Sequence, residues 1–297
     1  MPSHRSPSLL PLLAFLLALA GCATPPAAPP REAPLSYPPS VRERILRIAE
    51  AEWRDWGGIV LEAEAQAATP REEDHPTPGA ARPAESDPLN FPRVLAYWRA
   101  VDDAEAAGAV ARNRARYATL LAAPGAPSGL WSEPAWSAAF ISHVMRSAGL
   151  DRREFPPSAA HAFYIDALLA DAMAFPGHAP FLPRDWAAYA PRPGDLVCAD
   201  RSARPLPDWR ARLPEAGRFR PMHCDIVLAA GPGEVAAVGG NVRDAVTLSR
   251  FPADAAGRLL ARRGGGPTWF AVFENRLGRL PPWNAIPALA ANRSSAW

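Results

Sequence analysis

Residues 132–149 read SEPAWSAAFISHVMRSAG, and this stretch does more than any other to indicate the fold. Pro134 suits the first turn of a helix, and Gly149 suits the position just after the last turn. We therefore expect one helix here, with Trp136 and Ser137 close to its start.

The chain before this helix is predicted to be helical on either side of an exposed loop. Residues 40–67 place apolar side chains at helical spacing, and Ser40 is a plausible N-cap. The pair Gly57-Gly58 could break this segment into two. Residues 69–88 hold many prolines and charges without an apolar period, which predicts the loop. Residues 91–122 again show a helical stripe. We interpret residues 40–125 as a helical extension.

The chain after this helix changes character. Another helix is expected over residues 158–173. Short strand-like runs separated by Gly and Pro turns follow at residues 195–199, 224–229, 234–238, 245–248 and 269–274. Helices first and an antiparallel sheet afterwards is an α+β order. We assign residues 126–297 to this domain.

The N-terminus has the pattern of an export signal. An apolar run of about a dozen residues, too short to span a bilayer, ends in Leu19-Ala20-Gly21-Cys22. This string matches a lipoprotein cleavage site, so residues 1–21 are predicted to be a signal peptide and Cys22 the lipidated residue. Residues 22–39, rich in Pro and Ala, would form a tether. Ala23 after Cys22 favours the outer membrane, facing the periplasm.

Composition narrows the classes of partner and cofactor. The formal net charge is +2 with both signs interspersed, so nucleic acid is not an expected partner. Phosphate-binding glycine loops are absent, so no nucleotide cofactor is expected. The candidate ligands, His161, His223, Cys224 and Asp225, lack the paired spacing of zinc sites, so no metal is expected.

Four short sequence blocks follow one another along the chain, and their order is informative about the fold. They are WSAAF at residues 136–140, PGDLV at 193–197, HCDIV at 223–227 and VGGN at 238–241. In this order they resemble the CHAP and NlpC/P60 families of cell-wall peptidases and amidases, which have a papain-like fold. The resemblance covers residues 131–276. Within that group the chain looks most like DUF2272, a domain of unknown function in bacterial lipoproteins. The resemblance implies helices packed on an antiparallel sheet.

The resemblance also implies roles for three residues. Ser137 stands where those peptidases place a nucleophilic Cys, His223 matches their catalytic His, and Asn241 matches the residue that orients it. A serine hydroxyl needs a general base and an oxyanion hole to attack an amide. Each residue has a plainer alternative. Ser137 suits a helix start, His223 a half-buried strand start, and Asn241 a tight turn.

Other residues are candidates for the same cleft. His161 lies one turn into its predicted helix and could serve as base or ligand contact. Trp136 adjoins Ser137, and Asp225 shares a strand face with His223. In the resembled fold the strands of Cys198 and Cys224 pair antiparallel, so a disulfide is conceivable there. The alternative is two small buried apolar side chains.

Two functions from different classes follow. The first is a lipid-anchored amidase or endopeptidase of peptidoglycan peptide that uses Ser137, His223 and Asn241. The second is an inactive module that keeps the cleft and binds cell-wall peptide or another envelope protein.

Overall fold

A seven-stranded sheet organises the computed structural model, which describes residues 40–62, 83–123, 129–262 and 267–277. All of these lie in one unit, Ala33–Trp297. The predicted signal peptide, Cys22 and the tether lie outside the described residues. The main helices are α2 (Ser40–Asp55), α4 (Phe91–Arg99), α5 (Ala104–Ala122), α6 (Ser137–Ser147) and α7 (His161–Ala174). The strands are β1 (Val60–Glu62), β2 (Phe181–Arg184), β3 (Leu196–Asp200), β4 (Met222–Gly231), β5 (Glu234–Val242), β6 (Ala245–Pro252) and β7 (Thr268–Asn275).

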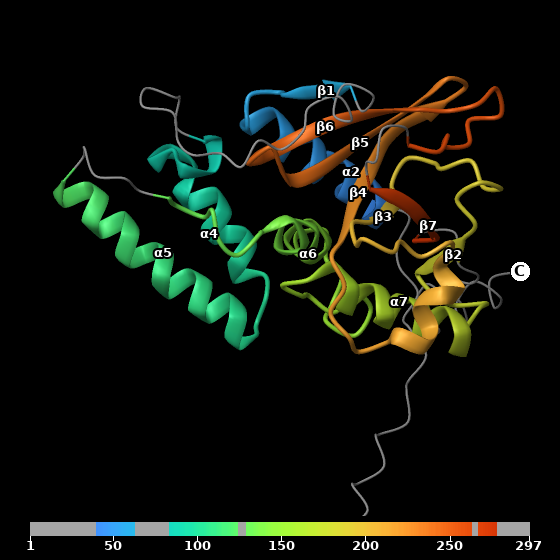
Figure 1. The fold of residues 1–297 in the computed structure, drawn as a ribbon, viewed down its shortest axis with the longest axis horizontal. Coiled ribbons are helices and arrows are strands. Elements are labelled where there is room, and N and C mark those ends of the chain that lie inside the picture. Colours follow the sequence, from blue (N-terminus) through green and yellow to red (C-terminus); the bar gives the residue numbers. More distant parts are fainter. Residues whose placement is uncertain (1–39, 63–82, 124–128, 263–266, 278–297) are drawn as a thin grey trace, which may run out of the picture. The chain divides into compact units, whose positions relative to one another are not determined.

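The sheet has the order β1-β6-β5-β4-β3-β7-β2 and is mixed (Figure 1). Strand β1 runs parallel to β6, while the other neighbours are antiparallel. The expected α+β class is confirmed, but the expectation of a purely antiparallel sheet was wrong. The predicted helix over residues 40–67 ends at Asp55, because Gly57 and Gly58 take positive φ angles of 93° and 67°. The chain then turns and adds β1 to the sheet edge.

The second helical stretch is two helices rather than one. Helix α4 ends at Arg99, and α5 begins at Ala104. The Asp103 carboxylate accepts the backbone N–H of Ala106 at 2.7 Å. Asp is favoured as an N-cap because its oxygen satisfies a free N–H of the first turn, so a new helix starts here.

The predicted exposed loop over residues 69–88 is wrong at its end, and its residues 69–82 lie outside the described residues. Two 3-10 helices, η1 (Ala84–Ser86) and η2 (Pro88–Asn90), occupy this part. Glu85 and Ser86 are buried. Local sequence shows no apolar period here because these residues are buried by contacts far along the chain.

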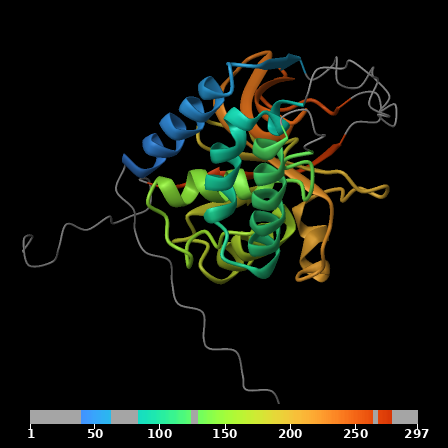
Figure 2. The same ribbon diagram turned by 90° about the vertical axis from the view of Figure 1, so that its left-hand side faces the viewer.

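Helices α2, α4 and α6 and one face of the sheet share a single hydrophobic core. Helix α6 packs on β4 and β5 and is covered by α4 and α2, with α5 outside α4 (Figure 2). Tyr97 of α4 meets Phe140 of α6 edge-on, with ring centroids 5.4 Å apart. The segment predicted as an extension is therefore part of the same core as the predicted domain. A smaller core lies on the opposite sheet face, around Val197, Val227 and Trp269.

The helix predicted from residues 132–149 is confirmed, with adjusted ends. It begins at Ser137, so Pro134 precedes it, and Gly149 with a φ of 99° follows its end. Helix α7 begins at His161, after Ala160 rather than after a Ser158 cap.

The strand β2 was not predicted, since Pro183 interrupts the pattern. Pro is tolerated in β2 because this strand is at the sheet edge. Among the described helices, none is long and apolar enough to cross a membrane.

Candidate active site

Ser137 is the first residue of α6, and its surroundings hold it firmly. The first hydrogen bond at this end of the helix joins Phe140 N–H to the Trp136 carbonyl, at 3.0 Å. The N–H groups of residues 137–139 therefore precede the ladder of helical hydrogen bonds. The Trp136 ring stacks on Trp56 with centroids 5.3 Å apart. Only 7% of Ser137 is exposed.

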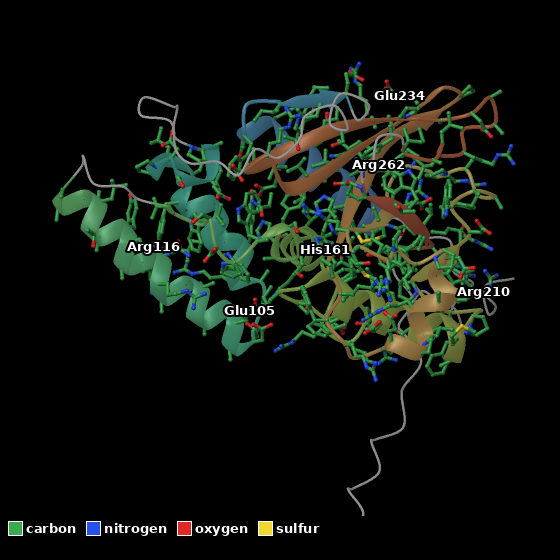
Figure 3. The ribbon with its side chains drawn as sticks, in the orientation of Figure 1. Glu105, Arg116, His161, Arg210, Glu234 and Arg262 are labelled. Atoms are coloured by element: carbon green, nitrogen blue, oxygen red, sulfur yellow. A yellow bond between two sulfur atoms is a disulfide. The ribbon has the colours of Figure 1, made fainter. Side chains whose placement is uncertain are left out.

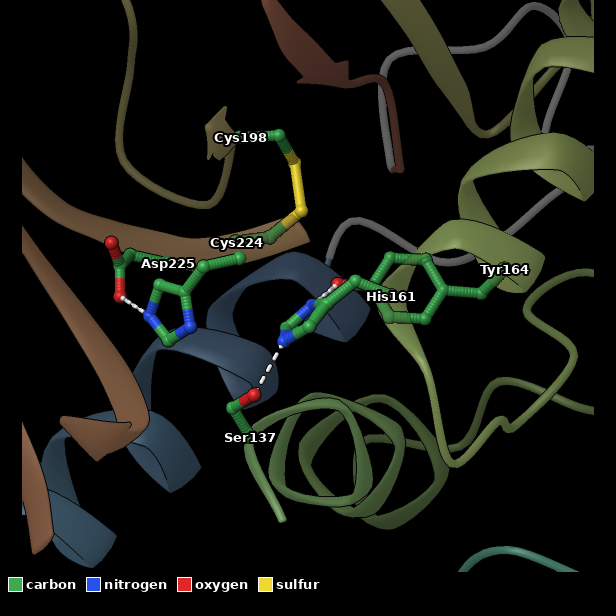
Figure 4. The surroundings of a disulfide bond; sticks show 7 residues. Ser137, His161, Tyr164, Cys198, Cys224 and Asp225 are labelled. Carbon is green, nitrogen blue, oxygen red and sulfur yellow. Dashed lines mark hydrogen bonds and ion pairs between the residues drawn. A yellow bond between two sulfur atoms is a disulfide. The ribbon is translucent and has the colours of Figure 1, made fainter. Parts of the chain in front are cut away.

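The partner of the Ser137 hydroxyl is His161. Ser137 Oγ lies 2.7 Å from His161 Nε2, and His161 Nδ1 lies 2.5 Å from the Tyr164 hydroxyl (Figure 4). The expected contact of Ser137 with His223 is therefore replaced by a contact with His161, the histidine that the sequence offered as the alternative base. Helix α7 starts beside α6, which brings His161 to the serine, whereas the resemblance had no counterpart for this helix position. His161 is interior, unlike Glu105 and Arg116 on the outer side of α5 (Figure 3).

His223 forms a pair with Asp225 rather than with Ser137 or Asn241. Its Nε2 lies 2.9 Å from Asp225 Oδ1. Both residues point to the same side of β4 because side chains two apart along a strand share a face. The His223 ring centroid is 5.2 Å from that of His161. The two histidines thus stand side by side, one paired with the serine and the other with an acid.

Two glycines of β5 make room for this site. A Cβ on Gly239 would lie 1.8 Å from Asp225 Oδ1 and 2.9 Å from His223 Nε2. A Cβ on Gly240 would lie 2.5 Å from the Phe140 Cβ of α6. Gly239 therefore admits the His223–Asp225 pair, and Gly240 admits the start of α6.

Asn241 belongs to a different cluster, so its expected role of orienting His223 was wrong. Its Nδ2 donates to Glu85 Oε2 at 2.9 Å, and Trp136 Nε1 donates to the same oxygen at 2.8 Å. Asn241 takes a positive φ of 56°, as its alternative interpretation as a turn residue predicts. Glu85 is buried between Trp136, just before α6, and Asn241, near the end of β5.

Burial sets the proton affinities of this region. Desolvation raises the pKa of Glu85 to about 7, against the opposing hydrogen bond from Trp136. Desolvation lowers the pKa of His161 well below its ordinary value, and the neighbouring His223 and Arg201 lower it further. Burial raises the pKa of Tyr164 well above its ordinary value. His161 is therefore neutral at neutral pH and can accept a proton.

Sequence reasoning missed Glu85, Tyr164 and the pairing of Asp225 with His223. Tyr164 follows His161 by three residues, a spacing that puts both on one helix face and could have suggested the contact. The glycine at 239 inside a strand also signals a close approach. In the sequence, no local signal distinguishes Glu85 from the other charged residues of the stretch 69–88.

Of the two alternatives for Cys198 and Cys224, the structure has the disulfide, which joins β3 to β4 (Figure 4). The two residues are directly opposite in the antiparallel register. Both side chains are fully buried. Among the described residues, no group of three or more His, Cys, Asp or Glu side chains is placed to hold a metal ion.

The fold and the site define an α+β protein with a buried serine–histidine pair at a helix N-terminus. The chain belongs to the family described as an uncharacterized protein conserved in bacteria (DUF2272), whose model matches residues 85–275. The matched range begins at Glu85 and includes α4 and α5. No curated protein matches the chain, and no solved structure matches it.

Proposed function

We propose that this protein is a serine-dependent hydrolase of amide or ester bonds, anchored in the cell envelope. The observation that carries the proposal is the 2.7 Å contact between Ser137 Oγ and His161 Nε2. A serine hydroxyl becomes a useful nucleophile when a base takes its proton during attack. His161 has the required reach, and its lowered pKa keeps the ring neutral before attack.

The start of α6 supplies the second requirement. The N–H groups of residues 137–139 lie ahead of the first helical hydrogen bond, which is donated by Phe140. Such groups, together with the positive end of the helix dipole, favour negative charge. They are suited to stabilise the oxyanion that forms when Ser137 attacks a carbonyl. Mutation of one such donor in serine hydrolases costs about 10²–10³ in rate.

Peptidoglycan peptide is the substrate class that we propose. The blocks around Ser137 and His223 resemble cell-wall peptidases with a papain-like fold. Two features support this resemblance: a helix starting at the nucleophile packs on the strand that carries the histidine, and β3 pairs antiparallel with that strand. A peptide amide has a resonance-stabilised carbonyl, whose hydrolysis needs the activated nucleophile and the oxyanion stabilisation that this site would supply.

The proposed place of action is the periplasmic face of the outer membrane, reached through lipidation of Cys22. The LAGC string and the Pro-rich tether support it. Metabolic labelling with a clickable palmitate analogue should mark the wild type and leave Cys22→Ser unlabelled. Membrane fractionation of both proteins checks the same point, and a labelled Cys22→Ser protein would refute the assignment.

The hydrolase proposal is tested with the soluble chain from residue 33 onward. A fluorophosphonate should label the wild type at one site, and Ser137→Ala should lose the label. Digestion of purified peptidoglycan, followed by chromatography of the released peptides, tests the substrate class. Absence of labelling and of turnover on both peptidoglycan and acyl esters would overturn the proposal. Ser137→Cys, which restores the thiol of the resembled enzymes, should retain acylation.

The second candidate is a binding module without turnover. It is favoured by the low exposure of Ser137, 7%, and by serine standing where the resembled peptidases have cysteine. Sedimentation with insoluble peptidoglycan distinguishes the two. Binding that is equal in the wild type and Ser137→Ala, without release of peptides, would support the module.

A further inference from the structure

The site holds two histidines that differ in partner and in exposure. His161 contacts the Ser137 and Tyr164 hydroxyls and is 4% exposed. His223 contacts the Asp225 carboxylate, and 14% of its side chain is exposed. His161 is thus enclosed beside the serine, while the His223 side chain is more exposed to solvent.

We propose that these histidines divide proton transfer between them: His161 accepts the Ser137 proton, and His223, held by Asp225, donates a proton to the leaving group. The inference rests on the hydrolase proposal and deepens it. A single histidine commonly performs both transfers in serine hydrolases. Here the Ser137 hydroxyl and the Asp225 carboxylate contact two different imidazole rings, whose centroids are 5.2 Å apart.

The proton balance closes over one cycle. In acylation, the Ser137 oxygen bonds to the carbonyl carbon, and its proton moves to His161 Nε2. The bond from carbon to the leaving nitrogen or oxygen then breaks, and that atom takes the proton from His223 Nδ1. In deacylation, water attacks the acyl carbon and returns a proton to His223 Nδ1. The ester bond to Ser137 breaks, and its oxygen recovers the proton held by His161.

The contacts assign the nitrogen atoms to these roles. A carboxylate only accepts hydrogen bonds, so His223 Nε2 donates to Asp225 and Nδ1 is left for the transfer. On the other ring, donation from His161 Nδ1 to the Tyr164 oxygen leaves Nε2 to accept from Ser137. Gly239 keeps Asp225 at this place, since a side chain there would occupy the carboxylate's position.

Charges from several elements surround the pair. Tyr164 and His161 come from α7, and Asp225 and His223 from β4. Arg201, after β3, influences His161, and Asp225 influences both Tyr164 and Arg262. The Arg262 guanidinium is over the Trp269 ring, 5.1 Å from its centroid. Burial lowers the pKa of His161, and the positive neighbours His223 and Arg201 lower it further, because a positive neighbour disfavours a second positive charge.

The dependence of the acylation rate on the leaving group tests whether the two histidines divide proton transfer between them. The probes are phenyl acetate and p-nitrophenyl acetate, which share an acyl group; p-nitrophenolate leaves readily without a proton, whereas phenolate gains more from one. The measurement is the pre-steady-state rate of acylation, corrected with Ser137→Ala. We expect His161→Gln to lose at least about 100-fold on both esters, as removal of a general base does. His223→Gln should stay within about threefold on p-nitrophenyl acetate and lose at least about tenfold more on phenyl acetate.

Asp225→Asn and His143→Gln complete the set. Asp225→Asn should reproduce the selectivity of His223→Gln in milder form. His143→Gln is the matched control, because His143 is also paired with a carboxylate, Glu52 at 3.4 Å, but stands outside the site. It should leave both rates unchanged. Thermal unfolding of each variant verifies that it is folded.

The pH profile of the wild type provides a test that needs no variant in the site. His223 must be protonated to donate, so acylation by phenyl acetate should fall at alkaline pH, while p-nitrophenyl acetate should lack this alkaline limb.

The outcomes separate the two proposals. No acylation and no phosphonate labelling of the wild type overturns the hydrolase proposal, and this inference with it. A second outcome overturns only the division of proton transfer between the two histidines. In it, the wild type is acylated, His223→Gln loses equally on both esters, and the two esters show the same fall in rate at alkaline pH. Loss of acylation in His223→Gln but not in His161→Gln would assign the base to His223.

Discussion

At the scale of single residues, the site depends on how closely backbone and side chains approach. The acid beside His223 comes from its own strand, two residues on, and occupies the space over Gly239. A side chain at Gly239 would occupy the place of the Asp225 carboxylate, so the glycine and the acid depend on each other.

Gly239→Ala should therefore disturb Asp225. Its Cβ would lie 1.8 Å from Asp225 Oδ1, which forces the carboxylate to move. Overpacking of this kind costs about 1–3 kcal/mol of the free energy of unfolding. Urea denaturation measures the loss, with Gly231→Ala as control, since nothing lies within 4 Å of a Cβ there. Combining Gly239→Ala with Asp225→Ala should cost less than the sum of the two; strict additivity would show that no clash exists.

Glu85 predicts a dependence of stability on pH. Its pKa is raised from 4.5 to about 7 in the folded protein, mainly by desolvation. Below pH 4.5 both states are protonated; between 4.5 and 7 the unfolded chain ionises while the folded protein keeps its proton. The contribution of Glu85 to the free energy of unfolding therefore declines as pH rises through that window, by on the order of 3 kcal/mol.

Glu85→Gln isolates this effect, because the amide oxygen can still accept from Trp136 and Asn241. Urea denaturation of both proteins at several pH values between 4 and 8 gives the difference curve. The wild type should lose stability relative to Glu85→Gln with increasing pH. A difference that stays level across this window would show that Glu85 does not titrate there.

At the scale of elements, the site is where the start of α6, the start of α7 and the first residues of β4 converge. The disulfide fastens β4 to β3 just behind His223. Strands β3 and β4 are separated by a long connection that contains η3 (Trp209–Glu215). A crosslink that closes such a connection limits the freedom of the unfolded chain.

Replacing both cysteines, in Cys198→Ala with Cys224→Ala, should lower the free energy of unfolding by about 2–4 kcal/mol, from a sequence separation of 26 residues. Replacing both avoids leaving a free thiol. Urea denaturation with and without a reductant measures the effect. Reductant should destabilise the wild type and leave the double variant unchanged. A wild type indifferent to reductant after full unfolding and refolding would contradict the stabilising role.

At the scale of the whole molecule, the helices before residue 125 and the sheet share one core. Trp136, next to the proposed nucleophile, contacts Trp56 and Tyr97 from this earlier part. The predicted boundary between an extension and a domain therefore falls across packed surfaces. Domains normally divide where few contacts cross.

A fragment of residues 126–297 should consequently fail to fold, while residues 33–297 should unfold cooperatively. The fragment lacks buried side chains such as Val41, Ile45, Val94 and Trp98. Burial of each large apolar side chain contributes about 1.5–3 kcal/mol, and the net stability of a protein is about 5–15 kcal/mol. Near-ultraviolet circular dichroism during heating checks both. A cooperative transition in the fragment would establish residues 126–297 as an independent domain.

The local sequence by itself determined the α+β class, the helix of Ser137 with its glycine stop, and five of the strands. These features depend on turn residues and apolar periods that are close along the chain. The order of the four blocks also placed Ser137, His223 and the cysteine pair in one region.

Only the tertiary structure decided which side chains meet. His161 reaches Ser137 because α7 starts beside α6, and Asp225 reaches His223 because Gly239 leaves space across the strand. Glu85 is buried by Trp136 and Asn241, residues 51 and 156 positions away. The local sequence pattern does not indicate which distant residues become neighbours. The partners of a polar side chain therefore depend on tertiary packing rather than on spacing along the chain.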